Sequence, residues 1–313
     1  MRKVQSVRIP MQRTRHLMFL LFLAVLVAIF WGPLCALVSL SLRRNEYSHI
    51  TLTPFISVLL LYWRRKEVFA RSLSTCGLSA IAILIGLLLY GVARHVGVTL
   101  SQDVAPSFSL SILGFAITCV GAFIFVYGWS AFRAALFPLG FLLFLVPLPM
   151  VLLTRIVAYL QEGSSETAAI ILRTVGVPFL RQGLVFRFAD FSIEVAAECS
   201  GIRSSTALLI TTLLAGQMFL RSNWKKLALC ILVVPVSIAK NGLRIATLST
   251  LAAYVNRAFL FGRLHRDGGF VFFAIGLLVI WGALRLLQLG DNPVAPADRS
   301  PTFVGQPARK AEI

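Results

Sequence analysis

Long apolar runs separated by short polar connections set the pattern of this chain. Eight runs approach the roughly 20 mainly apolar residues that a membrane-spanning helix needs. They cover approximately residues 17–42, 47–62, 77–93, 107–129, 134–153, 200–220, 227–253 and 269–288. The pattern therefore predicts an all-α polytopic integral membrane protein with about eight transmembrane helices.

The longest section between two runs, residues 154–197, carries two other patterns. Its first half predicts an amphipathic helix, because apolar residues recur at helical spacing beside Gln161, Glu162 and Glu166. Its second half alternates apolar and polar residues and predicts a β-hairpin that turns at Ala189-Asp190. The apolar members of this hairpin are Leu184, Phe186, Phe188, Phe191, Ile193 and Val195. We expect this insertion to lie outside the membrane, directly before the sixth helix.

Glycine and proline add two local expectations. Gly114, Gly121 and Gly128 recur every seven residues in the fourth run, which indicates a flat stripe where another helix packs closely. Pro147 and Pro149 should kink or end the fifth run, because proline has no backbone N–H to donate.

Charge separates the two sides of the membrane. The chain is 58% hydrophobic and 13% charged, and its 30 Lys+Arg against 12 Asp+Glu give a net charge of +18. The cations gather in residues 1–16, 64–71 and 221–226, which lie on one side of an eight-helix alternation. The positive-inside rule makes that side cytoplasmic, together with both termini. Loop topology and anionic membrane lipids thus explain the basic balance better than binding to nucleic acid does.

The same patterns divide the chain into three parts. Residues 1–16 form a basic cytoplasmic N-terminus, residues 17–289 the transmembrane domain, and residues 290–313 a tail whose composition predicts disorder. The first apolar run is too long for a signal-peptide core and lacks a small-residue cleavage site, so we expect it to be retained as a helix.

Cys199 stands where the alternating run meets the sixth helix. The partial positive charge of a first helical turn favours the thiolate, which is the nucleophilic form, so Cys199 is a candidate nucleophile. The competing interpretation is a buried structural thiol, which we assign to Cys35, Cys76, Cys119 and Cys230. The five cysteines form no C-x-x-C pair and show no spacing to histidine that would predict zinc.

Arg244 lies within the seventh apolar run, where a charge costs a few kcal/mol and by default indicates a functional site. Lys240 and Asn241 are one turn and three residues away, so the three form a polar stripe on one helix face. Arg244 could hold a thiolate, a developing oxyanion or a substrate carboxylate, and it could instead extend toward the outer interface.

His265 precedes the last run, flanked by Arg263 and Arg266. Positive neighbours favour its neutral form, which can accept a proton. Arg203 lies one turn beyond Cys199 and would add positive potential there. In the predicted topology Cys199, Arg244 and His265 converge on the outer face of the membrane.

These residues also resemble a known family. Cys199-Ser200-Gly201, then Asn241-Gly-Leu-Arg244, then His265 are similar in order to the exosortase/archaeosortase family, as are Pro147-Leu-Pro149 and Leu160-Gln161. The resemblance runs from about Phe132 to Leu289, whereas the N-terminal third matches only as generic membrane helices.

The resemblance implies a cysteine protease or transpeptidase in a bacterial cytoplasmic membrane. Such a protein would recognise a C-terminal sorting signal of the PEP-CTERM kind on exported proteins, in a system associated with exopolysaccharide production, and would cleave it outside the membrane. Cys199 would form a thioester, His265 would move protons and Arg244 would stabilise charge. No metal or organic cofactor is implied.

Two other functions stay open at this point. A transporter or lipid-handling protein could use Lys240 and Arg244 to bind an anionic substrate, although the chain has no internal repeat and no matching pair of broken helices. A purely structural assembly subunit would tolerate the loss of Cys199, Arg244 and His265.

Overall fold

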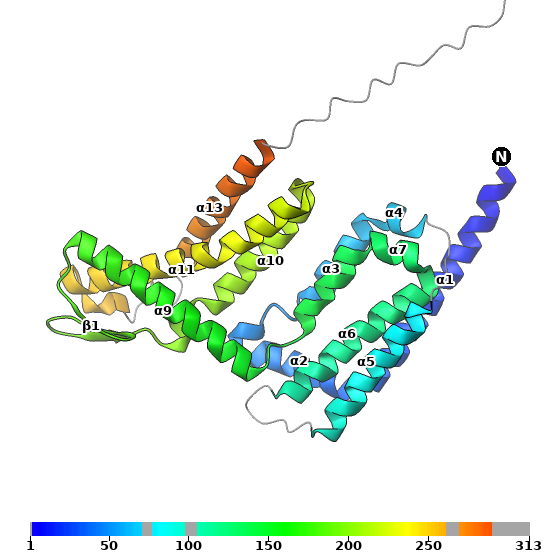
Figure 1. Cartoon of the computed structure of the whole chain (residues 1–313), viewed down its shortest axis with the longest axis horizontal. Coiled ribbons are helices and arrows are strands. Elements are labelled where there is room, and N and C mark those ends of the chain that lie inside the picture. The colour runs from blue at the N-terminus through cyan, green and yellow to red at the C-terminus, as the bar shows by residue number, and fades with distance from the viewer. Residues whose placement is uncertain (1, 71–76, 98–104, 261–268, 290–313) are drawn as a thin grey trace, which may run out of the picture.

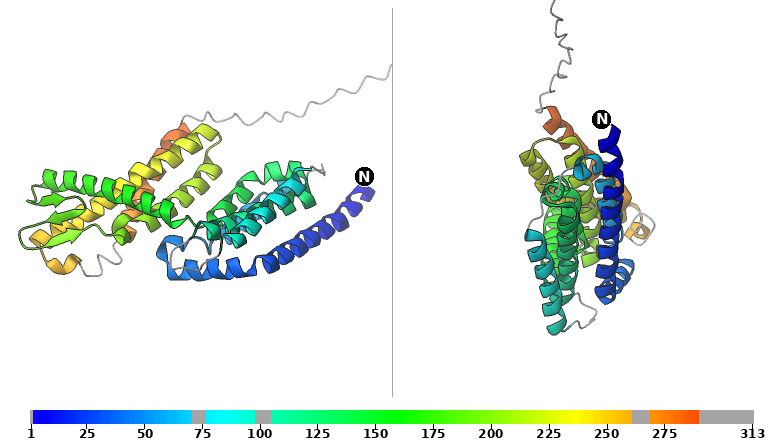
Figure 2. Two further views of the ribbon diagram at one scale, coloured as in Figure 1. Left: turned by 60° about the horizontal axis from the view of Figure 1, so that its bottom comes forward. Right: turned by 90° about the vertical axis from the view of Figure 1, so that its right-hand side faces the viewer.

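The computed structural model describes residues 2–70, 77–97, 105–260 and 269–289; the side chains of residues 2–11, 198–199 and 260 lie outside the description. The described chain is mostly helical and forms two groups of helices side by side (Figures 1 and 2). The first group contains α1 (Arg2–Ile29), α2 (Trp31–Arg43), η1 (Asn45–Tyr47), α3 (Thr53–Trp63), α4 (Arg65–Phe69), α5 (Leu78–His95), α6 (Pro106–Tyr127), α7 (Trp129–Ala134), α8 (Leu136–Gly140) and η2 (Phe141–Leu145).

The second group carries the insertion and the segments in which we expected the site. It contains α9 (Met150–Val175), β1 (Leu180–Gln182), β2 (Val185–Arg187), β3 (Ser192–Glu194), η3 (Ala197–Ser200), α10 (Ile202–Phe219), α11 (Asn223–Tyr254), η4 (Arg257–Leu260) and α13 (Gly269–Leu289).

Five described helices are long and apolar enough to cross a membrane, and they become six if a bent pair is counted as one span. They are Gln12–Ile29, Leu78–His95, Pro106–Tyr127, Asn223–Tyr254 and Gly269–Leu289, and the bent pair is Leu136–Leu145 with Met150–Val175. The described residues therefore form a multi-pass membrane protein, while the count of eight is not confirmed. The predicted second span is reduced to α3, which has 11 residues.

The fifth predicted span, residues 134–153, is broken rather than continuous. Its two helical parts meet at 94° across the segment that holds Pro147 and Pro149, as those prolines led us to expect. Proline supplies no N–H and disfavours helical geometry in the residue before it, so this apolar run cannot continue as one helix. Composition alone did not reveal how far the chain turns.

The close packing predicted from the glycine repeat joins α5 to α6. A Cβ added at Gly114 would lie 2.6 Å from the carbonyl oxygen of Gly86, and one at Gly121 would lie 2.8 Å from Ile83 Cγ1. Gly128 does not belong to this seam. It ends α6 with φ +87°, a conformation that side chains other than glycine rarely adopt.

The insertion before α10 contains the expected helix and hairpin, together with one strand that the pattern missed. The strands form an antiparallel sheet of order β1-β2-β3, in which Phe186 pairs with Arg181 on one side and with Ile193 on the other. Phe186 is fully buried and packs with Leu172 of α9 and Ala246 of α11. The sheet therefore lies against α9 and against α11, the helix that carries the polar stripe.

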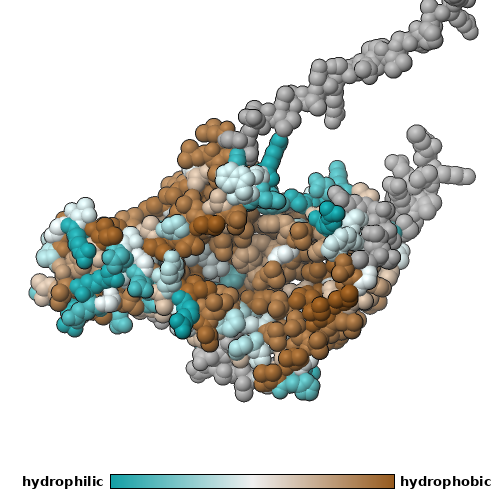
Figure 3. Space-filling view, in the orientation of Figure 1, coloured by the Kyte–Doolittle hydropathy of each residue, from teal (hydrophilic) through white to brown (hydrophobic). Residues whose placement is uncertain are grey.

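The basic loops lie along one edge of the molecule. In Figure 1, α4, α7, the connection between α10 and α11, the C-terminal end of α13 and the start of α1 all occupy the upper edge. Figure 3 shows apolar residues over much of the face between the edges and polar residues gathered at the end that holds the sheet. This arrangement agrees with the single basic side that the loop charges predicted.

Candidate functional site

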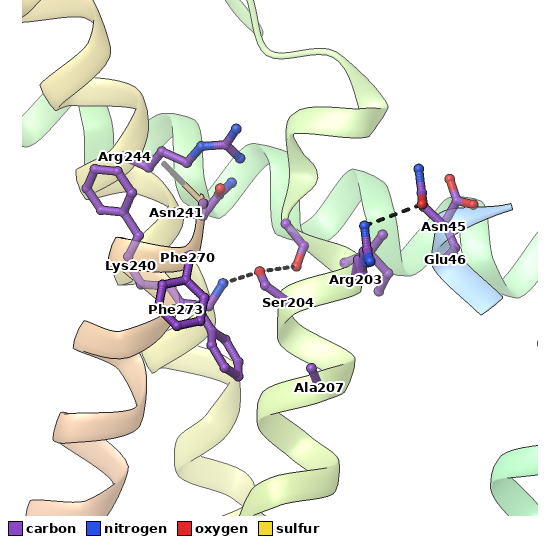
Figure 4. A pocket seen from close by; sticks show the side chains of 14 residues that line it. Asn45, Glu46, Arg203, Ser204, Ala207, Lys240, Asn241, Arg244, Phe270 and Phe273 are labelled. Carbon is purple, nitrogen blue, oxygen red and sulfur yellow. Dashed lines mark hydrogen bonds between the residues drawn. The ribbon is translucent and has the colours of Figure 1, made fainter. Parts of the chain in front are cut away.

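A cavity of about 550 Å³ lies where both helix groups meet near the start of α10. Its polar lining comes from η1, the first turn of α10 and the middle of α11, and consists of Asn45, Glu46, Arg203, Ser204, Lys240, Asn241 and Arg244. Phe270, Phe272 and Phe273 close it from the start of α13 (Figure 4). Four of the predicted site residues therefore line one cavity.

Gly201 forms a tight turn against α11. Its φ of +74° lies in the left-handed region, and a Cβ there would meet Asn241 Cγ and Oδ1 at 3.2 Å. Both observations favour glycine at this position. Ser200 directly precedes Gly201 and is almost completely buried.

Lys240 connects α11 to this turn through a hydroxyl group. Its Nζ donates a hydrogen bond of 2.6 Å to Ser204 Oγ, and Ser204 Oγ donates one of 3.0 Å to the carbonyl oxygen of Gly201 (Figure 4). Only 5% of Lys240 is exposed. Sequence reasoning missed Ser204, although its place one turn after the Cys-Ser-Gly segment put it on the same helix face.

Arg244 follows one turn after Lys240 on α11 and is half-buried. In Figure 4 its guanidinium extends from α11 toward the side on which the turn before α10 lies. A planar guanidinium can donate two parallel hydrogen bonds to one anionic group. The geometry thus offers a bidentate donor beside the Cys-Ser-Gly turn.

The connection between α2 and α3 closes the cavity from the first helix group. Arg203 Nη1 donates to Asn45 Oδ1 at 3.4 Å, and Glu46 also lines the cavity. Tyr47 is buried and donates through Oη to the carbonyl oxygen of Leu148 at 2.9 Å, which fixes η1 to the broken span. Sequence reasoning assigned no role to this connection, because only the fold brings it beside α10.

Gln161 of α9 supports the strand that leads into the site. Its Nε2 donates a 2.7 Å hydrogen bond to the carbonyl oxygen of Val195, and its side chain is buried. Val195 lies four residues before Cys199 and is itself 2% exposed. A buried carbonyl needs a partner, so Gln161 stabilises the path of this segment.

Glycine also permits the close approach of α9 to α11. A Cβ at Gly242 would lie 2.5 Å from Thr167 Cβ, and one at Gly163 would lie 3.0 Å from Ile238 Cδ1. These contacts pack α9, which carries Gln161, closely against α11, which carries Lys240, Asn241 and Arg244.

Two predicted residues fall wholly or partly outside the described chain. The main chain of Cys199 belongs to η3, but its side chain lies outside the described part of the chain, and so does the whole of His265. Gly201, two residues after Cys199, and Gly269, four residues after His265, both line the cavity. The roles of Cys199 and His265 therefore stay predictions.

A smaller apolar cavity of about 290 Å³ adjoins the site and shares Glu46 and Ile202 with it. Phe144, Leu153 and Leu209 line its apolar wall. Within the described ranges, no three His, Cys, Asp or Glu side chains group closely enough to hold a metal ion.

One family model accounts for most of this chain. The model of the transmembrane exosortases matches residues 41–282, which include the turn before α10, α11 and the start of α13. The match also begins well before Phe132, so the interpretation of the N-terminal third as generic helices was too narrow. Comparison with curated proteins and with solved structures found no match. The resemblance inferred from the sequence is thus confirmed, and the chain belongs to the transmembrane exosortase family.

Proposed function

We propose that this exosortase is a cysteine protease or transpeptidase that cleaves a C-terminal sorting signal, of the PEP-CTERM kind, from exported proteins. The observation that carries the proposal is the position of the Cys-Ser-Gly turn. Gly201, two residues after Cys199, lines a cavity of about 550 Å³ together with Asn241 and Arg244. A nucleophile at a helix start beside a guanidinium is an arrangement suited to acyl transfer.

The proposed reaction has two stages. His265 takes the proton of the Cys199 thiol, the resulting thiolate attacks the scissile carbonyl carbon, and the oxyanion that forms accepts hydrogen bonds from Arg244. When the C–N bond breaks, His265 gives a proton to the leaving amine, and the substrate remains attached to sulfur as a thioester. Water or the amine of an acceptor then attacks the thioester, His265 takes the proton from that nucleophile, and Cys199 leaves as the thiolate.

The described polar network would position these groups. The path from Lys240 through Ser204 to the Gly201 carbonyl fixes the first turn of α10, and Arg203 bonds to Asn45 at the edge of the cavity. None of these proposed steps uses a metal or organic cofactor. The protein partners of the site are exported proteins that carry the sorting signal.

The proposal includes a membrane topology. The basic edge formed by α4 and the connection between α10 and α11 faces the cytoplasm, with both termini, and the site faces the periplasm of a bacterial inner membrane. Residues 17–289 form the functional transmembrane domain, between a basic N-terminal segment and a C-terminal tail.

A second candidate function rests on the charge of the same cavity. Buried Lys240 and half-buried Arg244 could bind an anionic substrate for transport or lipid handling. Among the described helices there is one broken pair, in α8–η2 and α9, whereas inverted-repeat transporters pair two such breaks in matching halves. This difference favours the protease.

Cleavage of an exported substrate protein, here called the client, distinguishes the protease from the transporter or lipid-handling protein. A membrane-anchored exported client is produced with the wild-type protein, Cys199→Ala, Cys199→Ser or Cys230→Ala, and the mass of the client is measured. Both Cys199 variants should leave the client uncut, because neither supplies a thiolate. Cys230→Ala is the matched control, since Cys230 lies on α11 near its cytoplasmic end and should not affect cleavage. Identical mature clients from wild type and Cys199→Ala would exclude Cys199 as the nucleophile.

A further inference from the structure

A second polar cavity lies at the opposite end of α10 from the site. It has a volume of about 480 Å³ and is lined by the α3–α4 junction, by α7, α8 and η2, by the last two turns of α10, and by the start of α11. Leu213 and Gln217 line it from α10, whereas the site uses residues 201–207 of the same helix. The nearest lining residues of the two cavities on α10, Ala207 and Leu213, are six residues apart, which at 1.5 Å per residue is about 9 Å along the helix.

The charged side chains that line this second cavity are all positive. Arg64, Arg133 and Lys226 contribute three cations, and the described residues that line the cavity include no carboxylate. Lys226 Nζ donates a 2.9 Å hydrogen bond to Gln217 Oε1, which holds the ammonium at the cavity wall. Arg133 is exposed, whereas Arg64 and Lys226 are half-buried. Three converging cations without an acidic partner in the lining create a site for an anion.

The rest of the lining is aromatic and apolar. Phe137 and Phe141 line the cavity from α8 and η2, and Phe141 packs with Leu60 of α3 and Ile210 of α10. A free inorganic anion would gain nothing from this surface. An amphiphile with a phosphate at one end and a hydrocarbon chain at the other would use both kinds of lining.

The position of the cavity also fits such a ligand. Its lining residues Arg64, Arg133 and Lys226 belong to the α3–α4 junction, to α7 and to the start of α11. These elements lie on the basic edge that the charge rule assigns to the cytoplasm (Figure 1). The inner leaflet contains anionic lipids, and basic pockets between transmembrane helices on that side bind their headgroups.

We propose that this cavity, lined by Arg64, Arg133 and Lys226, binds one anionic phospholipid. The phosphate lies among the three cations, and an acyl chain lies over Phe137 and Phe141. Because α3 and α7 belong to the first helix group and α10 and α11 to the second, the lipid bridges the two groups. This binding is independent of the reaction proposed for Cys199.

The test uses the purified full chain in neutral detergent and measures retained lipid by native mass spectrometry. Phosphatidylglycerol should be retained, and phosphatidylcholine with the same acyl chains should not. Arg64→Gln and Arg133→Gln should each weaken phosphatidylglycerol binding about fivefold, and the double variant about 25-fold, as expected for charges near a membrane surface. Arg221→Gln is the matched control, because Arg221 is exposed on the same edge but does not line the cavity.

Two further arms distinguish the source of the anion and the part played by the aromatic wall. Inorganic phosphate should not raise the unfolding temperature, whereas phosphatidylglycerol should, and Phe137→Ala should weaken retention of the lipid. Equal stabilisation by inorganic phosphate would reject the lipid as the ligand. Unchanged retention in the Arg64/Arg133 double variant, or an equal loss in Arg221→Gln, would reject the site.

Discussion

Two helix pairs in this protein pack unusually closely, and glycine makes both contacts possible. In α5–α6 the added Cβ of Gly114 would meet the backbone of Gly86, and in α9–α11 that of Gly242 would meet Thr167. What the two pairs bury differs. Buried Thr118 and Ser111 of α6 donate to carbonyl oxygens of their own helix, so α5–α6 is a packing element.

The α9–α11 pair buries polar side chains whose burial costs much more free energy. Lys240 and Asn241 of α11 and Gln161 of α9 are all buried. A cation at the centre of a membrane helix costs about 3 kcal/mol on insertion scales, whereas a hydroxyl that bonds its own helix costs little. Close glycine packing is common to both pairs and therefore does not distinguish them. The α9–α11 pair differs because it keeps buried polar groups in spite of the free energy that their burial costs.

The largest expected effect is a difference in chemical labelling between the two ends of α11. Single cysteines at Ser222 and Asn256, placed in a background without the native cysteines, are treated in intact cells with an impermeant maleimide. In the proposed topology the basic edge faces the cytoplasm, so Asn256→Cys should be labelled and Ser222→Cys should not. Labelling at position 222 with protection at 256 would place the site on the cytoplasmic face and overturn the proposed topology.

Arg244 should lose function when its geometry changes while its charge is kept. Arg244→Lys keeps a cation but loses the bidentate fork, so client cleavage should fall about 100-fold while accumulation in the membrane stays normal. Arg94→Lys in α5 is the matched control and should cleave normally, because Arg94 belongs to the packing pair. Wild-type cleavage by Arg244→Lys would mean that Arg244 acts only as a point charge.

Gln161→Met should weaken the path into the site and leave α9 helical. The carbonyl oxygen of Val195 would lose its 2.7 Å donor, at a cost of about 1–3 kcal/mol for an unpaired buried group. We expect cleavage to fall about tenfold with a lower unfolding temperature. Gln288→Met, near the end of α13, serves as control. Full activity with Gln161→Met would show that Gln161 does not position the segment before Cys199.

Valine at the two glycine contacts sharpens the comparison further. Gly121→Val and Gly242→Val should each lower stability by about 1–3 kcal/mol through overpacking. Only Gly242→Val should also lower cleavage per folded molecule. Gly242 lies on α11, which carries residues of the site, whereas Gly121 lies on α6, which carries none of the residues that line the cavity. Thermal unfolding and client cleavage, both normalised to folded protein, measure the two effects. An equal loss of specific activity in both variants would remove the functional distinction between the pairs.

The structural features that sequence reasoning predicted in agreement with the structure are those with a strong local signal. Alternation predicted the hairpin of β2 and β3, and the spacing of Lys240, Asn241 and Arg244 placed them on one face, in agreement with the cavity that they share. Composition likewise gave a multi-pass membrane protein. These features depend on neighbours three or four residues away, which a sequence displays directly.

The features that sequence reasoning missed depend on contacts between distant segments of the chain. Asn45 reaches Arg203 across 158 positions of the chain, and no local pattern in the connection between α2 and α3 announces that contact. Strand β1 has the sequence Leu-Arg-Gln, whose single apolar residue shows no alternation of apolar and polar side chains. The 94° bend follows from how η2 and α9 pack, so the prolines predicted a break but not its angle.

The most direct measurement concerns the covalent intermediate at Cys199. Membranes that contain the wild-type protein and its client are denatured at mildly acidic pH, which preserves thioesters, and are then separated by mass. The proposed reaction predicts an enzyme–client adduct that neutral hydroxylamine releases and that Cys199→Ala does not form, while Cys230→Ala forms it normally. An adduct that persists in Cys199→Ala, or client cleavage without any hydroxylamine-sensitive species, would contradict catalysis by Cys199.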